Sequence, residues 1–232
     1  DGNGFIDDIH GYDFIGDDGD ASPDTDESFN VGALSHGTVI AGIIGATGDD
    51  DEGIAGVNWE VEIMSVRILD GEGVGNSNLA RLGVEYAVEN GADVINLSFT
   101  GFDADDRLRR AVQEAYEAGV VVVAAVGNTD DGGTNIDDRP IYPACFGERA
   151  SEDWILGVAS TDEDDVKSEF SNYGRTCTDI SAPGENIIST VFQDDDMLGF
   201  EVYLQGGWSG TSMASPMVAG AAALLLAAHP SL

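Results

Sequence analysis

Three short segments of the chain place a reactive side chain beside small residues. Residues 35–38 hold His36 next to a glycine, where an apolar stretch begins. Asn128 follows Gly127 directly after the apolar run VVVVAAV, and Ser212 lies where a glycine turn enters a second apolar stretch. An imidazole can carry a proton, a serine hydroxyl can attack a carbonyl carbon, and an amide NH₂ can donate to a developing oxyanion. These are the residue types that acyl transfer needs.

Each of the three side chains also has a purely structural alternative. A single histidine is more often structural than catalytic, and an asparagine after a strand is an ordinary turn residue. A serine at the start of a helix is an ordinary N-cap. Pro216 and the small residues around Ser212 keep other side chains away from its hydroxyl, which favours a reactive role there. Residue type alone leaves both interpretations open.

Alternating strands and helices surround these segments and must position them. The apolar pattern predicts strands at residues 62–69, 93–99, 120–126, 154–159 and 187–191, and helices at residues 31–46, 77–90, 104–118 and 217–228. Continuous apolar strands that alternate with helices indicate a parallel sheet covered on both faces. Ligands bind beyond the carboxyl ends of such strands, which is where Asn128 lies. With no internal repeat or linker, residues 1–232 are predicted to form one α/β domain.

Charge and length argue against two classes of partner. The chain has 44 Asp plus Glu against 9 Lys plus Arg, a formal charge of −35, and Lys167 is its only lysine. Nucleic acid needs a basic footprint, and anionic membrane surfaces would repel this chain. The most apolar stretch, residues 217–228, is shorter than the roughly 18–20 residues that cross a bilayer, and predicts a buried core helix. The acidic excess favours a high-salt source; a secreted protein neutralised by calcium is the alternative.

The segments SHGT, AAVGN and GTSMASP, in this order, resemble those of the subtilisin-like serine proteases, the subtilases. The shorter motifs HGT, INLS, YPA, FSNYG and APG support this resemblance over nearly the whole chain. The resemblance implies a three-layer subtilisin-like fold with a mainly parallel central sheet flanked by helices. It also implies a serine endopeptidase that hydrolyses peptide bonds of proteins through an acyl-enzyme intermediate.

The resemblance assigns roles to individual residues. Ser212 would be the nucleophile and His36 the general base and acid, while Asn128 and the Ser212 backbone N–H would form the oxyanion hole. Thr100 stands where the family usually has glycine, which narrows strand pairing on that side of the cleft. The implied substrate-binding residues are Gly73, Val74 and Gly75 on one edge, Ser98, Phe99 and Thr100 on the other, and Ala125 and Gly127 in the pocket wall. GEGVG does not fit the G-x-G-x-x-G fingerprint, which disfavours a nucleotide-binding domain.

The catalytic Asp of the family has no counterpart at the expected place. In the family it lies in an Asp-Thr/Ser-Gly turn after a strand, upstream of the histidine. The closest match, Asp24-Thr25-Asp26, lacks the glycine and follows no apolar strand. In relatives with a segment like DGNGFIDD the Asp strand comes first, so the resemblance implies that this Asp lies before Asp1. The chain is then a piece truncated at both ends and close to inert; a catalytically inactive subtilase fold used for binding or structure is the alternative.

Two acidic loops are candidate calcium sites. Asp1, Asn3, Phe5 (through its backbone oxygen) and Asp8 space hard oxygen ligands as calcium prefers. Gly-Tyr-Asp-Phe resembles a calcium-binding stretch of some thermostable family members, which implies a second set. That second set is Asp13, Asp18 and Asp20. Solvated acidic loops are the alternative for both.

Cys145 and Cys177 are the only cysteines, and neither belongs to a C-x-x-C pair, which disfavours a zinc or redox site. In the family fold their loops lie near one another, so the resemblance implies a disulfide; two buried thiols are the alternative. A disulfide fits an extracellular protein. The expected molecule is therefore a secreted, calcium-stabilised monomer that acts on proteins or peptides.

Overall fold

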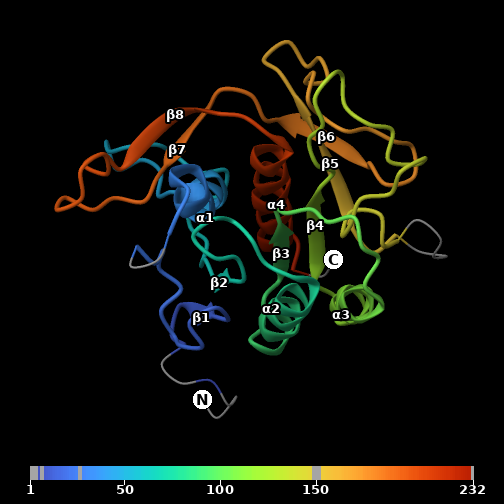
Figure 1. Ribbon diagram of the computed structural model, residues 1–232, viewed down its shortest axis with the longest axis horizontal. Coiled ribbons are helices and arrows are strands. Elements are labelled where there is room, and N and C mark those ends of the chain that lie inside the picture. The colour runs from blue at the N-terminus through green and yellow to red at the C-terminus, as the bar shows by residue number, and fades with distance from the viewer. Residues whose placement is uncertain (1–4, 6–7, 26–27, 148–152, 231–232) are drawn as a thin grey trace.

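A computed structural model describes the chain at residues 5, 8–25, 28–147 and 153–230. Its centre is a parallel sheet of four strands in the order β3-β4-β5-β6 (Figure 1). The strands are β3 (Val94–Leu97), β4 (Val121–Ala125), β5 (Leu156–Thr161) and β6 (Ile180–Pro183). Ile95 lies opposite Val122, and Ala124 opposite Gly157. The predicted α/β class and parallel sheet are confirmed.

Four helices accompany this sheet in the described part of the chain. They are α1 (Val31–Gly45), α2 (Ser77–Glu89), α3 (Asp106–Glu117) and α4 (Thr211–Ala228). Three lie within two residues of their predicted bounds, and the last begins six residues before the predicted residue 217. The side chains of Asn30, Asn76 and Asp105 cap the first three helices by accepting hydrogen bonds from backbone N–H groups of the first turn. Those groups have no acceptor inside the helix, so each cap fixes where its helix begins.

The two faces of the sheet carry separate hydrophobic cores, as the alternation of β4 requires. Val122 and Ala124 point to one face, where they pack in the largest cluster with Val84 of α2 and Val112 of α3. Val123 points to the other face, where it packs with Val158 of β5 and with Ala214, Val218 and Ala219 of α4. The helices therefore form layers on both sides of the sheet.

Two smaller sheets flank the central one and differ from expectation. The strands β1 (Gly11–Asp13) and β2 (Ser65–Arg67) form a parallel pair, and β7 (Ile187–Thr190) and β8 (Leu204–Trp208) form an antiparallel hairpin. Figure 1 shows the hairpin above α1 and the β1–β2 pair below it. The strand predicted at residues 187–191 is thus real, but it does not join the parallel sheet. β1, β6 and β8 lack long apolar runs and were not predicted.

The helix α4 is buried along only half of its length. Its first ten residues are mostly buried, whereas Leu224 and Leu225 are 44% and 53% exposed. By length and composition it is the one helix of the described residues that could cross a membrane, a test that core helices of soluble proteins also pass. Its packing against α1 and against β3, β4, β5 and β6 makes its first half a core helix of this fold. The prediction of a buried core helix is confirmed for the first half of α4 and is wrong for the second half.

Cys145 and Cys177 form a disulfide in the structure, and both side chains are buried. The bond joins the loop after β4 to the segment that leads into β6. It therefore holds together two connections of the central sheet.

Candidate active site

The N-terminus of α4 is held by Asn128, which follows β4. The Asn128 Oδ1 atom accepts hydrogen bonds from the backbone N–H and the hydroxyl of Thr211, both at 3.0 Å. Gly210 precedes the helix with a φ of 155°, which favours glycine, and a Cβ there would lie 3.2 Å from Asn128 Nδ2. Because the oxygen of Asn128 is used in anchoring, its NH₂ group faces the turn that carries Ser212.

Pro216 leaves the carbonyl oxygen of Ser212 without its usual partner in the helix. Proline has no N–H, so it cannot bond the carbonyl four residues earlier. The Ser98 hydroxyl donates to this oxygen instead, at 3.0 Å. The Ser212 hydroxyl in turn donates to the Ser98 carbonyl oxygen at 3.2 Å. Pro216 thereby ties the first turn of α4 to the end of β3.

A chain of hydrogen bonds also supports the contact between the first turn of α4 and the end of β3. The Ser215 hydroxyl donates to Asn96 Oδ1 at 2.7 Å, and Asn96 Nδ2 donates to the Ser98 hydroxyl at 2.9 Å. All donors point in one direction, toward the backbone of Ser212, and such chains strengthen each member. Sequence reasoning gave no role to Asn96 or Ser215. The signal was a polar residue inside the apolar strand INLS.

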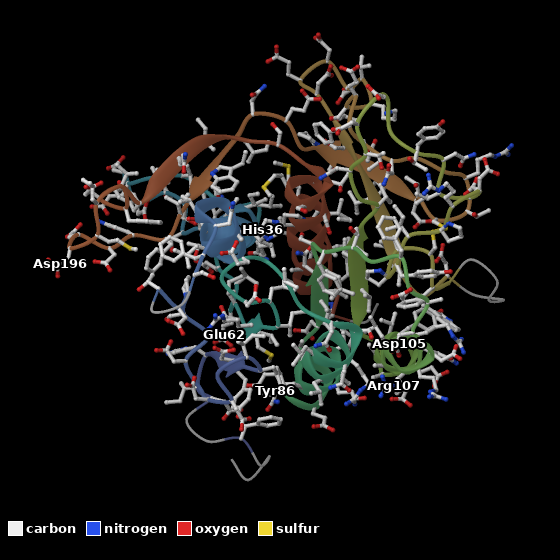
Figure 2. The ribbon with its side chains drawn as sticks, in the orientation of Figure 1. His36, Glu62, Tyr86, Asp105, Arg107 and Asp196 are labelled. Carbon is white, nitrogen blue, oxygen red and sulfur yellow. A yellow bond between two sulfur atoms is a disulfide. The ribbon has the colours of Figure 1, made fainter. Side chains whose placement is uncertain are left out.

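His36 lies on α1, the helix that packs against α4. The helix begins at Val31, so His36 is in its second turn rather than at its start. Val39, one turn further on, packs in one cluster with Met213, the neighbour of Ser212. The hydroxyls of Ser189 and Thr190 fix α1 by donating to the carbonyl oxygens of Val39 and Thr38, both at 2.8 Å. The structure thus places His36 and Ser212 on facing helices, and Figure 2 shows His36 on α1 beside α4.

Burial lowers the pKa of His36 below its ordinary value of 6.5. We expect His36 of this 232-residue chain to be neutral when folded at a pH where the unfolded chain already binds a proton. The stability that it contributes is then present above pH 6.5 and is lost as the pH falls through the folded pKa. Denaturant unfolding at pH 7.5 and 5 should show a smaller loss of stability in His36→Gln than in the wild-type chain. Equal losses in both proteins would contradict the burial of His36.

The segments predicted to bind substrate lie around the contact between the first turn of α4 and the end of β3. Gly73 has a φ of 78°, and a Cβ there would lie 3.2 Å from that of Ala33 on α1; Val74 is 61% exposed. On the other side, the Thr100 methyl lies 3.2 Å from where Gly127 would carry a Cβ. Ser98 bonds the backbone of Ser212. Three predicted substrate-binding residues remain. Gly75 forms a β-bridge with Leu69, Phe99 packs against the largest hydrophobic cluster, and Ala125 is buried.

The first predicted calcium set lies partly outside the described residues, whereas the second lies within them. Asp1 and Asn3 lie outside the described residues, while Asp8 accepts a hydrogen bond from the Tyr86 hydroxyl and the Phe5 ring packs on that of Tyr86. The pKa of Tyr86 rises to about 12 because of burial and the Asp8 carboxylate. Calcium at this set stays a prediction.

In the second set, Asp13 is buried and pairs with Arg67 at 2.7 Å. Asp18 and Asp20 accept hydrogen bonds from backbone N–H groups two residues further on. A carboxylate that an arginine already neutralises is a poor calcium ligand, and the described residues contain no group of three or more such side chains arranged to hold a metal. Calcium at residues 13–20 therefore also stays a prediction, with Arg67 as a competing partner of Asp13.

The structure brings together a serine at a helix N-terminus, an amide donor at the carboxyl end of a parallel strand and a histidine on the facing helix. These are the groups that a serine hydrolase uses for acyl transfer. Comparison with known proteins agrees with this class. The chain belongs to the Subtilase family (peptidase S8), whose profile it matches over residues 3–232.

Known relatives are similar along most of the chain. It is 36% identical to subtilisin DY of Bacillus licheniformis, over 92% of this chain and 71% of the relative. It is 38% identical to thermitase of Thermoactinomyces vulgaris, over 94% of this chain and 67% of the relative. The crystal structure of a cold-adapted subtilisin-like serine proteinase superposes with a TM-score of 0.74 at 33% identity, covering 94% of this chain and 67% of that one. The subtilisin-like fold is confirmed.

The relatives differ in location. One match, 38% identical over 61% of its length, is the major intracellular serine protease of Bacillus subtilis. Another, 38% identical over 36% of its length, is the halolysin-like extracellular serine protease Nep of Natrialba magadii. Family membership therefore supports a serine protease that acts on proteins, and leaves the compartment open.

Proposed function

We propose that this chain is the larger part of the catalytic domain of a serine endopeptidase. The observation that carries the proposal is the anchoring of Asn128, whose oxygen is held by Thr211 so that its NH₂ group lies at the turn before Ser212. A donor fixed before the reaction stabilises an oxyanion without reorganisation at the moment of attack. The N–H of Ser212, in the first turn of α4, has no acceptor within the helix and is the second donor.

The proposed reaction uses these groups in turn. Ser212 turns its hydroxyl from the Ser98 carbonyl toward His36, which accepts the proton as the serine oxygen attacks the substrate carbonyl. Asn128 and the Ser212 N–H stabilise the tetrahedral oxyanion. His36 then gives the proton to the leaving amine, and an acyl-enzyme remains on Ser212. Water, activated by His36, hydrolyses the ester and restores the serine.

A third group must orient His36, and we propose that an Asp on a strand upstream of residue 1 supplies it. The connection β2–α2–β3 supports this, because consecutive parallel strands joined by a helix normally lie in one sheet. Here β2 pairs only with β1, and β3 only with β4, among the described strands. Ile68, just after β2, nevertheless packs on the same core as β3. One further parallel strand between β2 and β3 would join the two sheets.

Substrate would bind in an extended form between the exposed Val74 segment and the Ser98–Thr100 segment, by adding a strand to each edge. The small residues near Asn128 favour apolar side chains of modest size before the scissile bond. We further propose that the protein is secreted, with the Cys145–Cys177 disulfide as support. A high-salt environment, with a monomer as its working form, is supported by the charge of −35.

An inactive fold is the second candidate, because one observation favours it. The Ser212 hydroxyl has a single proton and donates it to the Ser98 carbonyl rather than to a base. A scaffold without catalysis would keep this arrangement permanently.

Fluorophosphonate labelling tests the choice between the two. We expect the full-length protein to be labelled at Ser212, and the 232-residue chain to be labelled far more slowly until the upstream segment is added. A folded full-length protein that takes no label would contradict the endopeptidase and leave the scaffold. Labelling of the 232-residue chain at the full-length rate would contradict the upstream Asp alone.

A further inference from the structure

The ammonium group of Lys167 lies among backbone carbonyl oxygens. Its Nζ donates to the carbonyl oxygens of Ser168 at 2.8 Å, Ser171 at 2.9 Å and Gly132 at 3.2 Å. It also lies 5.6 Å from the centre of the Tyr173 ring. Three acceptors match the three N–H bonds of an ammonium, so its hydrogen-bonding capacity is filled.

This use of the lysine is unexpected for so acidic a chain. Lys167 is the only lysine among 232 residues that include 44 carboxylates. Yet the ion pairs within the described residues all use arginine, and Lys167 has no carboxylate within 4.0 Å there. A positive charge kept at this one place, on backbone oxygens rather than carboxylates, indicates a specific requirement for a cation.

The carbonyls that Lys167 binds belong to two segments in close backbone contact. Gly133 lies so near Ser171 that a Cβ on it would be 2.0 Å from the Ser171 oxygen. The two backbones are thus in contact, and the carbonyl oxygen of the buried Ser171 would be costly to leave without a donor. The same residue, Ser171, forms a β-bridge with Asn128.

Residues 168–172 also form backbone hydrogen bonds with the residues on both sides of Asn128. The N–H of Thr129 donates to the Phe170 oxygen at 2.8 Å, and the N–H of Asn172 donates to the Gly127 oxygen at 3.1 Å. The position of the Asn128 backbone thus depends on residues 168–172. Lys167 joins that segment to Gly132, beside the hydrogen bond that the Thr134 N–H donates to Asn172 Oδ1 at 2.8 Å.

We propose that Lys167 is a positioning residue for the oxyanion donor: its ammonium joins residues 132–133 to residues 168–172 and thereby fixes Asn128. The proposal rests on the proposed function. A misplacement near 1 Å of a group that meets the transition state can cost about 10²-fold in rate. Loss of the ammonium therefore lowers kcat and leaves KM nearly unchanged.

The test uses the full-length protein with Lys167→Met, and with Arg175→Ala as the control. Arg175 is an exposed cation on the following turn, so its removal changes the net charge equally. We expect kcat for a peptide substrate to fall about 10- to 100-fold in Lys167→Met, with KM within about twofold, and both to stay constant in the control. In the Asn128→Leu background, Lys167→Met should have no further effect on kcat.

Two further readouts separate positioning from general stability. In Lys167→Ala, ammonium ions should restore part of kcat, whereas tetramethylammonium at the same ionic strength, which has no N–H to donate, should not. Hydrogen exchange at the N–H groups of Thr129 and Asn172 should be faster in Lys167→Met, whether or not the protein is active.

Unchanged exchange at both amides would overturn the proposal even in an inactive protein. Faster exchange with an unchanged kcat would also overturn it, because the junction would then serve stability alone. An inactive wild-type protein that takes no fluorophosphonate would instead overturn the proposed function, which the exchange experiment does not depend on.

Discussion

Replacing Ser212 with alanine in the full-length protein is expected to lower kcat for a peptide substrate by about 10⁶-fold, the size of the effect that loss of the nucleophile has in a subtilisin. The reason is that the acyl-enzyme cannot form without the serine oxygen. KM should change little, because the hydroxyl contributes little to substrate binding. Steady-state kinetics and fluorophosphonate labelling, which should disappear entirely, measure the two consequences.

Ser209→Ala is the matched control for this variant. Ser209 lies three residues earlier in the same turn, and its hydroxyl accepts a hydrogen bond from the Asn186 N–H. Its loss should leave activity within a few-fold of wild type. If Ser212→Ala retained labelling, another nucleophile would be responsible, and the assignment of Ser212 would be wrong.

The sequence predicted the parts of the fold whose patterns are local. The helices with an asparagine or aspartate cap and an apolar face, such as α2 and α3, agree with prediction to within about two residues, the usual uncertainty of helix ends. β4 was recognised because a strand buried on both faces is apolar throughout. β6, by contrast, consists of Ile-Ser-Ala-Pro with three exposed residues, and only its pairing with β5 makes it a strand.

In the candidate site, too, local patterns could be recognised in the sequence and contacts between distant residues could not. Ser212, His36 and Asn128 could be proposed as site residues because short motifs carry them. The contacts that hold them could not, because they join residues more than 80 positions apart, such as Thr211 with Asn128 or Ser215 with Asn96. The consequence of Pro216 was also hidden, since the Ser212 carbonyl that it releases finds its donor at Ser98, just after β3.

Asn128→Leu should lower kcat by about 10²–10³-fold with little change in KM, the range known for loss of one oxyanion donor in a subtilisin. The donor meets a negative oxygen only in the transition state, so substrate binding does not depend on it. The structure adds a complication, because Asn128 Oδ1 also accepts two hydrogen bonds from Thr211. Leucine removes this anchor together with the donor.

Two variants separate the donor from the anchor. Asn128→Asp keeps an oxygen for Thr211 but replaces the NH₂ with a negative acceptor, so kcat should fall at least as far as in Asn128→Leu while the melting temperature falls less. Thr211→Val removes the hydroxyl bond to Asn128 and the one that this hydroxyl accepts from the Gly127 N–H. It keeps the donor, and the Thr211 N–H still holds Asn128, so kcat should fall far less. A wild-type rate in both Asn128 variants would remove this residue from the site. Equal losses of kcat in Asn128→Asp and Thr211→Val would instead assign Asn128 to anchoring α4.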